Sequence, residues 1–388
     1  MRKAEINGSL IYFLYFAAQG TIIPIAILFF QKHGLSLEQA TLVLVICRIV
    51  GFLAGPVWAV IADVFQIHKK MLPIALALCV PSILMLNSSY TFVSILFFYA
   101  MYSFSNAPII SLTDNAVLNL LGKENHRYGI VRLWGSVGWS VSVFATGFVL
   151  QNLGYQFAPW MYAFFFLFAI LISLQMPATK LTSKVIISPG SFKLFLSRRW
   201  IGLLFTGLAS GLGGVIIINY LAPFLKNMGV AEGMIGISLT AASVSEIPFF
   251  LFMPQIMKRL SPEQSIRVSL VLMAIRCSAY GIFQNATAVF FIQLLHGFSY
   301  GLYWTAGVMY AQRIAPQGLD ASSQALFGAF YHFLSGTIGV FIGGWMYQAL
   351  GANVMFQFSA IMALVGLFVF NILNKPDLPL VSLQPQAE

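Results

Sequence analysis

Charged residues are scarce in this chain of 388 residues: only 8% are Asp, Glu, Lys or Arg, whereas 59% are hydrophobic. Water-soluble globular domains carry roughly a quarter charged residues, so this composition excludes an ordinary soluble enzyme or binding domain. Acidic residues are the scarcer kind, 11 against 21 basic ones, which leaves a net charge of +10. We expect lipid to solvate most of the surface of such a chain.

Cysteines and catalytic motifs are also scarce. Cys47, Cys79 and Cys277 lie in apolar stretches and form no CxxC pair, so we expect buried thiols rather than a disulfide framework or a metal site. The sequence contains no HExxH, nucleophile-elbow or phosphate-binding-loop motif. "GLGG" at 211–214 falls inside an apolar stretch and indicates helix packing. We therefore expect neither enzymatic activity nor a cofactor.

Long apolar runs dominate what is present. About twelve stretches approach the ~20 residues that cross a bilayer as a helix, at approximately 6–30, 39–62, 71–88, 91–112, 128–150, 155–175, 200–223, 233–254, 266–283, 287–311, 322–348 and 352–373. None shows the alternation of a strand. Because lipid offers the backbone no hydrogen-bond partner, they predict an all-α integral membrane protein with twelve transmembrane helices.

The positive charges are unevenly distributed between these stretches. With a cytoplasmic N-terminus, sixteen lysines and arginines fall in cytoplasmic segments, and only Lys32 and Lys226 fall in outer loops. This positive-inside pattern predicts that both termini are cytoplasmic. The basic surplus thus reflects membrane topology rather than nucleic-acid binding. We expect a multi-pass protein of the bacterial inner membrane.

The longest polar interruption separates six apolar stretches from six. "PIAILFFQKHGLS" at 24–36 is faintly echoed by "YLAPFLKNMGVAE" at 220–232, each following the first helix of its half. Two parallel six-helix halves are typical of the major facilitator architecture. The expected organisation is an N-terminal bundle at 1–176, a cytoplasmic loop at 177–199, a C-terminal bundle at 200–374 and a cytoplasmic tail at 375–388.

The segment "GPVWAVIADVFQIHKK" at 55–70 has the Gly, Asp and basic cluster of the facilitator loop between the second and third helices. In that family the loop latches the cytoplasmic ends of the two bundles and gates alternating access. By this resemblance Asp63 is the acidic member of the latch, and Lys69 and Lys70 are the basic ones. The two lysines fit an ordinary charged turn equally well.

Ionisable residues inside apolar stretches are costly in lipid, so each one is a candidate functional group. Asp114 and Arg132 lie nine residues before and after Lys123, near the turn of a helical hairpin, and should sit at equal depth. We expect them to form a bidentate carboxylate–guanidinium pair. The alternative is that each side chain reaches the cytoplasmic interface independently.

The second half has a deeper set of ionisable residues. Arg276 and His296 each lie ten residues from the turn near residue 286, and Glu246 lies fourteen from the turn near 260, against sixteen for Arg276. At ~1.5 Å per residue this difference is only about 3 Å of height. We expect these three side chains to share a layer near the bilayer midplane, where transporters place substrate and coupling ions. A purely structural charge cluster is the alternative.

Further candidates are polar or aromatic residues at comparable depth. His296, Ser299, Tyr300 and Tyr303 fall on one helical face by their spacing. The candidates for substrate contact from this reasoning are Gln19, Asn219, Tyr220, Tyr300 and Tyr303. Arg48 is a further buried charge. An ordinary histidine titrates near neutral pH, which makes His332 a candidate, although a structural hydrogen bond explains it equally well.

"RLWGSVGW" at 132–139 resembles the fifth helix of the lactose permease group, in which an Arg precedes a Trp by seven residues. Glu246, the Arg276 of "IRCS" and the His296 of "LLHGFS" follow the order of that group's Glu, Arg and His in helices 8, 9 and 10. "LLHGFSYG" and "SQALFGAFYHFLSGTIGVFIGGWMY" resemble more closely the phenylpropionate-permease and nucleoside-permease side of this branch of the major facilitator superfamily.

The resemblance implies roles for residues of the first half. Asp114 and Arg132 would hold hydroxyl or carboxylate groups of the substrate, and Trp139 would stack on its ring. Arg132 and Trp139 are two turns apart on one helical face, which gives a charged group beside a flat π surface. Packing of Trp139 into a groove at Gly135 and Gly138 is the alternative.

The resemblance also implies that Glu246 and His296 link substrate binding to proton movement. One departure matters: Ser299 stands where the lactose permease group has its proton-carrying glutamate. A coupled proton must therefore be carried by Glu246, His296, Asp114 or His332. Glu246 is our first choice, and competition between proton and substrate for Arg276 would couple their movements.

Together these features predict a secondary active transporter that imports a small polar or anionic organic solute with protons by alternating access. An aromatic acid, a nucleoside, a sugar-like compound and a metal-chelating organic acid all fit. A proton-driven exporter of drugs or metabolites and a lipid-handling facilitator are the alternatives. The expected partners are the solute, protons and the bilayer, without nucleic acid. We expect a monomer.

Overall fold

The computed structural model describes residues 3–65, 67, 70–122, 127–176, 196–315 and 319–374, which are mostly helical. The first half contains α1 (Lys3–Ile22), η1 (Ile23–Ile25), α2 (Ala26–Lys32), α3 (Leu37–Phe65), α4 (Met71–Leu84), η2 (Met85–Ser88), α5 (Phe92–Asn106), α6 (Ile109–Leu121), α7 (Tyr128–Leu153) and α8 (Phe157–Ser173). The second half contains α10 (Arg198–Asn227), α11 (Glu232–Arg259), α12 (Pro262–Ile282), α13 (Ala286–Gln293), η4 (Gly297–Gly301), α14 (Leu302–Arg313), α15 (Asp320–Gly328), η5 (Ala329–Leu334), α16 (Ser335–Leu350) and α17 (Ala352–Leu373).

The prediction of an all-α membrane protein is confirmed for the described residues, which include no strand. Ten of their helical segments are long and apolar enough to cross a membrane, and α8 is a shorter apolar helix. The stretch predicted at 287–311 corresponds to α13, η4 and α14, which a turn at 294–295 interrupts. The chain is therefore a bundle of apolar helices.

The stretch predicted at 91–112 ends too early. The helix α5 is followed directly by α6, which continues to Leu121. Hydropathy falls at "TDN" (113–115), but Thr113 is buried and Asp114 lines an internal cavity. Polar residues that face the protein interior need no contact with lipid, so the helix continues beyond the apolar run.

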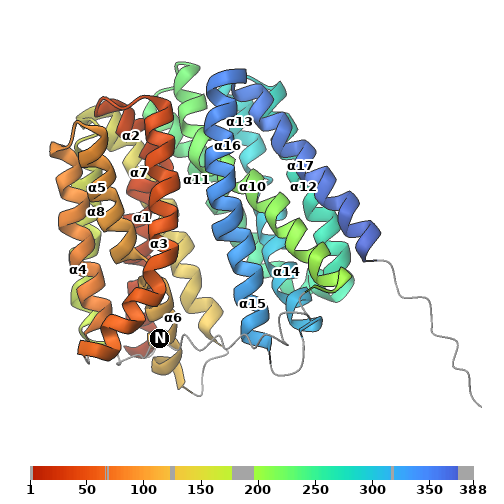
Figure 1. Ribbon diagram of the computed structural model, residues 1–388, viewed down its shortest axis with the longest axis horizontal. Helices are drawn as coiled ribbons and strands as arrows, with labels where there is room; N and C mark the ends of the chain where they lie inside the picture. The colour runs from red at the N-terminus through yellow and green to blue at the C-terminus, as the bar shows by residue number, and fades with distance from the viewer. Residues whose placement is uncertain are drawn as a thin grey trace, which may run out of the picture.

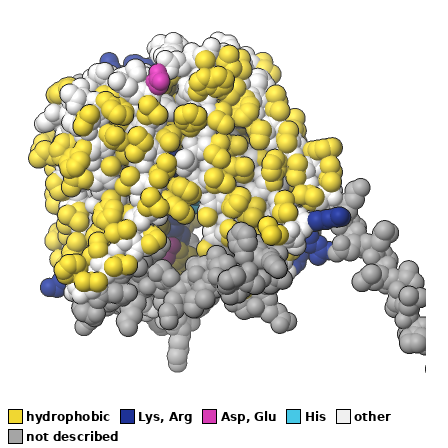
Figure 2. Space-filling model, viewed as in Figure 1, with side chains coloured by type: hydrophobic (Ala, Val, Ile, Leu, Met, Phe, Trp, Pro, Cys, Tyr) yellow, Lys and Arg dark blue, Asp and Glu magenta, His cyan; other side chains and the backbone are white. Residues whose placement is uncertain are grey.

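Helix α8 shows how these helices divide lipid from core. Its exposed residues Trp160, Phe164, Leu167 and Leu171 follow a helical spacing. Tyr162 and Phe166, on another face, are buried. Hydrophobic side chains cover most of the molecular face in Figure 2, while most of the lysines and arginines visible there lie near its edges. Such a surface suits a bilayer.

The two halves stand side by side, with α1–α8 in one and α10–α17 in the other (Figure 1). Helices α7 and α11 meet where Gly147 faces Gly236, so closely that a Cβ on Gly147 would lie 2.9 Å from the Gly236 Cα. Nearby, the Ser140 hydroxyl donates to Ser243 Oγ at 2.8 Å. Small residues let these backbones approach, as is common between helices in membranes.

A second contact joins the halves along α3 and the η5–α16 run. The ring of Phe52 stacks on Phe333 with centroids 3.8 Å apart. Further along, Gly344 of α16 leaves room for the Thr41 side chain of α3. Two separate helix pairs therefore hold the halves together, and the space between the pairs is free for a cavity.

Packing inside the first half depends on Gly138 of α7. A Cβ at this position would overlap the backbone carbonyl group of Phe13 in α1. We expect Gly138→Ala to lower the apparent melting temperature of the purified protein by several degrees, because overpacking a helix contact costs about 1–3 kcal/mol. Gly328→Ala is the control, since a Cβ at Gly328 meets no atom within 4 Å. Equal melting temperatures for the two variants would contradict this account of the α1–α7 contact.

Candidate functional site

A cavity of about 1350 Å³ lies between the two halves. Its described lining includes seven charged or histidine side chains from both halves: Arg48, Asp114, Arg132, Glu246, Arg276, His296 and His332. The cavity extends to Gly129 at the start of α7 and to Met257 near the end of α11, towards the end of the molecule where α1 begins (Figure 1). Figure 2 shows basic and acidic side chains in a recess near this end.

Asp114 and Arg132 both line the cavity, but the expected bidentate ion pair between these two described residues does not form. The Tyr12 side chain of α1 contacts both. Its hydroxyl donates to Asp114 Oδ1 at 2.5 Å, and its ring centroid lies 5.1 Å from the Arg132 guanidinium. The ring of Phe16, one turn along α1, lies 4.3 Å from the same guanidinium. Aromatic rings of α1 thus take the place that the carboxylate was expected to fill.

Arg132 keeps its hydrogen-bond donors available as a result. Among the described residues, none forms a hydrogen bond or ion pair with its guanidinium, which is stabilised by π faces instead. Trp139, two turns further along α7, also lines the cavity and packs partly against the core. The cavity wall therefore presents a guanidinium and an indole on one helix.

Two of the predicted contact residues lie in interhelical or local hydrogen bonds and not on the cavity wall. Gln19 is buried in the first half, where it donates to Asn106 Oδ1 at 2.8 Å and accepts from the Tyr102 hydroxyl at 2.5 Å. Asn219 donates to the carbonyl oxygen of Val215 in its own helix at 2.8 Å. Counting from a turn gives the height of a residue but not the direction of its side chain, so the structure does not bring these two residues to the cavity wall.

Tyr220 is also absent from the described cavity lining. It is fully buried, and its hydroxyl donates to the carbonyl oxygen of Val340 in α16 at 2.6 Å. The same hydroxyl lies 3.2 Å from Thr41 Oγ1 in α3. Tyr220 therefore joins the two halves, and its predicted substrate contact is not supported.

The π-helix η4 changes which residues of this segment face the cavity. A π-helix is wider than an α-helix, with i→i+5 hydrogen bonds, and π-helical turns are frequent at functional sites. His296, Tyr300 and Trp304, spaced four apart, line the cavity. Tyr303 instead points into the second half, where its hydroxyl hydrogen-bonds with Thr206 Oγ1 at 2.9 Å. The α-helical spacing assumed from the sequence therefore gave Tyr303, which lies outside the described lining, and omitted Trp304, which lies in it.

Glu246, His296 and Arg276 meet in one network, as their equal depth predicts. His296 Nε2 lies 2.8 Å from Glu246 Oε1, and His296 Nδ1 lies 2.7 Å from Arg276 Nη1. Arg276 is 1% exposed and also donates to Gln293 Oε1 at 2.5 Å and to Ser299 Oγ at 3.5 Å. Ser299, the departure from the lactose permease pattern, thus belongs to the same network. Gln293 is not among the candidates selected from the sequence. Its position one helical turn before His296 would have indicated that it lies beside the same network.

These contacts define the protonation state of His296. Arginine nitrogens only donate, so His296 Nδ1 must accept and carries no proton. The single ring proton is then on Nε2, which donates it to Glu246. A proton added at Nδ1 would face the N–H of Arg276, so this geometry favours a neutral His296 that donates through Nε2 to Glu246.

Arg48 and His332 line another part of the cavity wall. The His332 ring packs against Trp304 with centroids 4.7 Å apart, and against Tyr331 at 4.9 Å.

The predicted latch between the second and third helices lies mostly outside the described residues. Lys69 and the side chain of Asp63 are among those not described, and Lys70 is exposed just before α4. The latch therefore remains a prediction.

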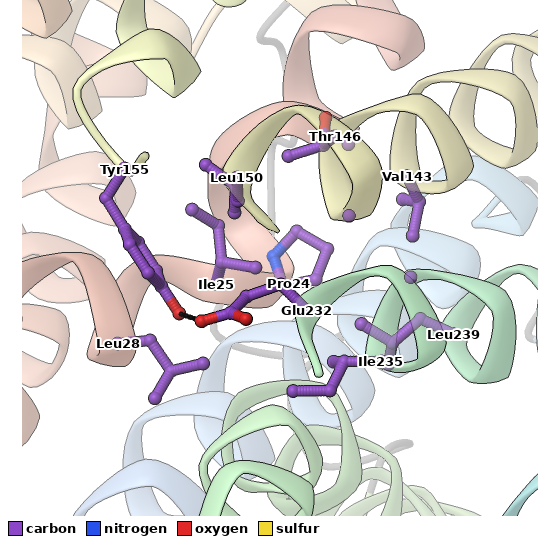
Figure 3. A pocket seen from close by; sticks show the side chains of 13 residues that line it. Pro24, Ile25, Leu28, Val143, Thr146, Leu150, Tyr155, Glu232, Ile235 and Leu239 are labelled. Atoms are coloured by element: carbon purple, nitrogen blue, oxygen red, sulfur yellow. Dashed lines mark hydrogen bonds between the residues drawn. The ribbon is translucent and has the colours of Figure 1, made fainter. Parts of the chain in front are cut away.

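At the opposite end, contacts between described residues hold the halves together. A cavity of about 10 Å³, with room for about one water molecule, is lined there mainly by residues of η1, α7 and α11. Figure 3 shows Tyr155 directed at Glu232, and its hydroxyl donates to Glu232 Oε1 at 3.2 Å. Lys226 Nζ lies 2.6 Å from the same oxygen, and the Gly233 N–H donates to Gln151 Oε1 at 3.0 Å. The large cavity therefore lies on one side of a closed contact.

The fold agrees with comparisons to known proteins. A family model described as the MFS_1 like family matches residues 6–358. The chain belongs to this family and is a transporter of the major facilitator superfamily. It is therefore a multi-pass membrane protein and not an enzyme.

Individual relatives cover nearly the whole chain. A maltose permease from Geobacillus stearothermophilus is 24% identical over 372 residues, which cover 95% of this chain and 94% of the permease. The transporter YwbF from Bacillus subtilis (strain 168) is 24% identical over 361 residues, covering 92% and 90%. The crystal structure of the nucleoside transporter NupG superposes with a TM-score of 0.82 at 16% identity, covering 97% of this chain and 100% of that one.

The closed end yields a test of its own. Glu232→Gln removes the carboxylate charge that accepts the hydrogen bond from Tyr155 of the first half and that pairs with Lys226 in its own half, and the loss of a charge contact at this exposure is worth about 0.2–1 kcal/mol. The reporter is a Thr146→Cys thiol, which lines the small cavity, in a background without the three native cysteines. We expect this thiol to react with a maleimide about two to five times faster when Glu232→Gln is also present. Glu38→Gln, an exposed acid on α3, is the control. Equal rates in all variants would show that the Glu232 contacts do not keep this end closed.

Proposed function

We propose that the protein is a proton-coupled importer of a small polar or anionic organic solute, working by alternating access. The observation that carries this proposal is the Glu246–His296–Arg276 network on the wall of a cavity shared by both halves. Ionisable groups at such depth in transporters mark proton and substrate pathways. The network offers a single proton site next to the space where a solute binds.

Our proposal includes the full topology. We count twelve spans by adding α8 and the α13–η4–α14 run to the ten long apolar segments. The distribution of lysine and arginine favours cytoplasmic termini, a bacterial inner membrane and the division into 1–176, 177–199, 200–374 and 375–388. In this orientation the cavity extends towards the cytoplasm, and the Glu232 contacts close the outer end. The described conformation is then the inward-facing one.

Charge balance in the network would supply the coupling. While Glu246 is ionised, its charge offsets that of Arg276 through the neutral His296. A proton on Glu246 removes this compensation, so the field of Arg276 attracts the polar or anionic group of a solute. Loss of the proton to the cytoplasm restores the compensation and favours solute release. Proton and solute are thus carried in the same direction.

The first half would supply substrate recognition. Arg132 has unused donors, and Trp139 lines the same wall, so together they suit a hydroxyl group beside a ring. Tyr300, on the facing half, adds a phenol to the lining. Maltose and nucleosides, the solutes named for two relatives, both combine several hydroxyl groups with rings. A hydroxylated or aromatic organic solute fits this wall.

Three arginines against two carboxylates in the described lining oppose binding of lipophilic cations, which counts against a drug exporter. Import with protons predicts that adding the solute to energised cells makes the medium more alkaline. Export in exchange for protons predicts no such change on external addition. A lipid-handling facilitator would respond to neither.

The proton site is tested with Glu246→Gln, which keeps a hydrogen-bonding side chain but does not ionise. In proteoliposomes we expect this variant to retain counterflow exchange of a labelled solute and to lose uphill uptake driven by a proton gradient. Glu263→Gln is the control, because Glu263 pairs with Arg313 outside the described lining of the main cavity. Unchanged accumulation by Glu246→Gln would exclude Glu246 as the coupling group.

The recognition role of Arg132 is tested by thermal stabilisation of purified protein. The screen covers nucleosides, small sugars, aromatic acids and organic-acid metal chelators. A solute that stabilises the wild type should need at least about tenfold higher concentration with Arg132→Ala, since a hydrogen bond to a charged group contributes about 1.5–3 kcal/mol. Arg267→Gln is the control, because Arg267 bonds Asn371 away from the cavity. Equal stabilisation of Arg132→Ala would place recognition elsewhere.

A further inference from the structure

Arg48 is a charge that the described part of the chain leaves unbalanced. It lies on α3 and lines the cavity. Among the described residues, none forms an ion pair or a hydrogen bond with its side chain. A guanidinium stays protonated at ordinary pH. An unpaired charge at membrane depth is costly, so the position calls for an anion from outside the chain.

The other charged residues in the described lining of the cavity do not supply an anion for Arg48. Glu246 offsets Arg276 through the network described above, and Asp114 lies on the same wall as Arg132. The described lining contains three arginines and two carboxylates, so one positive charge remains. Arg132 and Asp114 both contact Tyr12, whereas no described carboxylate interacts electrostatically with Arg48. The excess charge is therefore located on α3.

The second half completes the surroundings of Arg48. Gly336 of α16 lies against the guanidinium, so that a Cβ there would be 2.5 Å from Arg48 Nη1. His332, one turn earlier, interacts electrostatically with Arg48 and packs against the indole of Trp304. Arg48, His332 and Trp304 all line the cavity. A guanidinium, an imidazole and a flat indole face thus meet at one place.

We propose that Arg48 and His332 form the anion-binding subsite of the cavity, and that the solute carries a carboxylate which binds there between the two halves. The guanidinium offers paired donors that match a carboxylate, and the His332 ring offers one more. This proposal rests on the proposed transport function and names the chemical class of its substrate: an organic monocarboxylate.

The assignment divides recognition between two sites. The carboxylate of the solute binds at Arg48, and its hydroxyl or ring portion reaches Arg132 and Trp139. Because Arg48 belongs to the first half and His332 to the second, a bound carboxylate also bridges the α3 contact between the halves. One monoanion carried with one proton on Glu246 moves no net charge across the membrane.

The test uses full-length purified protein and two pairs of probes: benzoate with benzamide, and 3-phenylpropionate with 3-phenylpropanamide. Within each pair only the carboxylate is charged. We expect the carboxylates to stabilise the wild type at lower concentration than their amides. With Arg48→Gln, the concentration needed for the carboxylates should rise at least about tenfold, while that for the amides stays the same.

Two further variants keep the result interpretable. Arg48→Lys retains the charge and should keep most of the preference for carboxylates, and Arg267→Gln, outside the cavity, should behave as wild type. Without any probe, Arg48→Gln should melt at a temperature at least as high as the wild type, because it removes an unbalanced charge.

Three results would overturn the proposal: no stabilisation of the wild type by either carboxylate, equal preference for carboxylates in wild type and Arg48→Gln, or a lower melting temperature of probe-free Arg48→Gln. The proposed transport function fails in a different way. Carboxylates would then bind with the expected dependence on Arg48, but a proton gradient would drive no uptake into proteoliposomes.

Discussion

The cost of a charge at membrane depth is the constraint on which this structure depends. Arg276 has Glu246 as its counter-charge, with His296 between them. Arg132 lies against aromatic rings of α1. Arg48 has no described counter-charge. A carrier that leaves one cation unbalanced is expected to be most stable when a suitable anion is bound, and in our proposal this cost makes the cavity selective for anionic substrates.

Close backbone contacts make the cavity possible. Glycines at Gly147 and Gly236 bring α7 and α11 together near one end, and Gly344 lets α16 approach α3. With the halves held there, the large cavity lies between them towards the other end. Contacts built from small residues are tight but involve few large side chains. Under the proposed alternating access, such contacts could form and break with little side-chain rearrangement.

Depth along the membrane could be predicted from the sequence, and side-chain direction could not. The rise per residue of a helix is constant, so counting from a turn placed Glu246, Arg276 and His296 in one layer. The same counting could not give the direction of the Gln19 and Tyr220 side chains, which are buried in contacts between helices and absent from the described cavity lining. The π-helix η4 likewise changes which side chains face the cavity, so a prediction that assumes 3.6 residues per turn fails there.

The sequence by itself determined the class of fold, the apolar segments, the uneven placement of positive charge and the set of ionisable residues at depth. Those features follow from composition and order along the chain, because lipid accepts apolar helices and excludes charge. Only the tertiary structure decided which groups meet: Asp114 with Tyr12 in place of Arg132, and Arg48 with no described carboxylate. The lipid-facing and protein-facing sides of these helices are both apolar. The sequence pattern therefore carries little information about how each helix is rotated about its axis, and packing between helices sets that rotation.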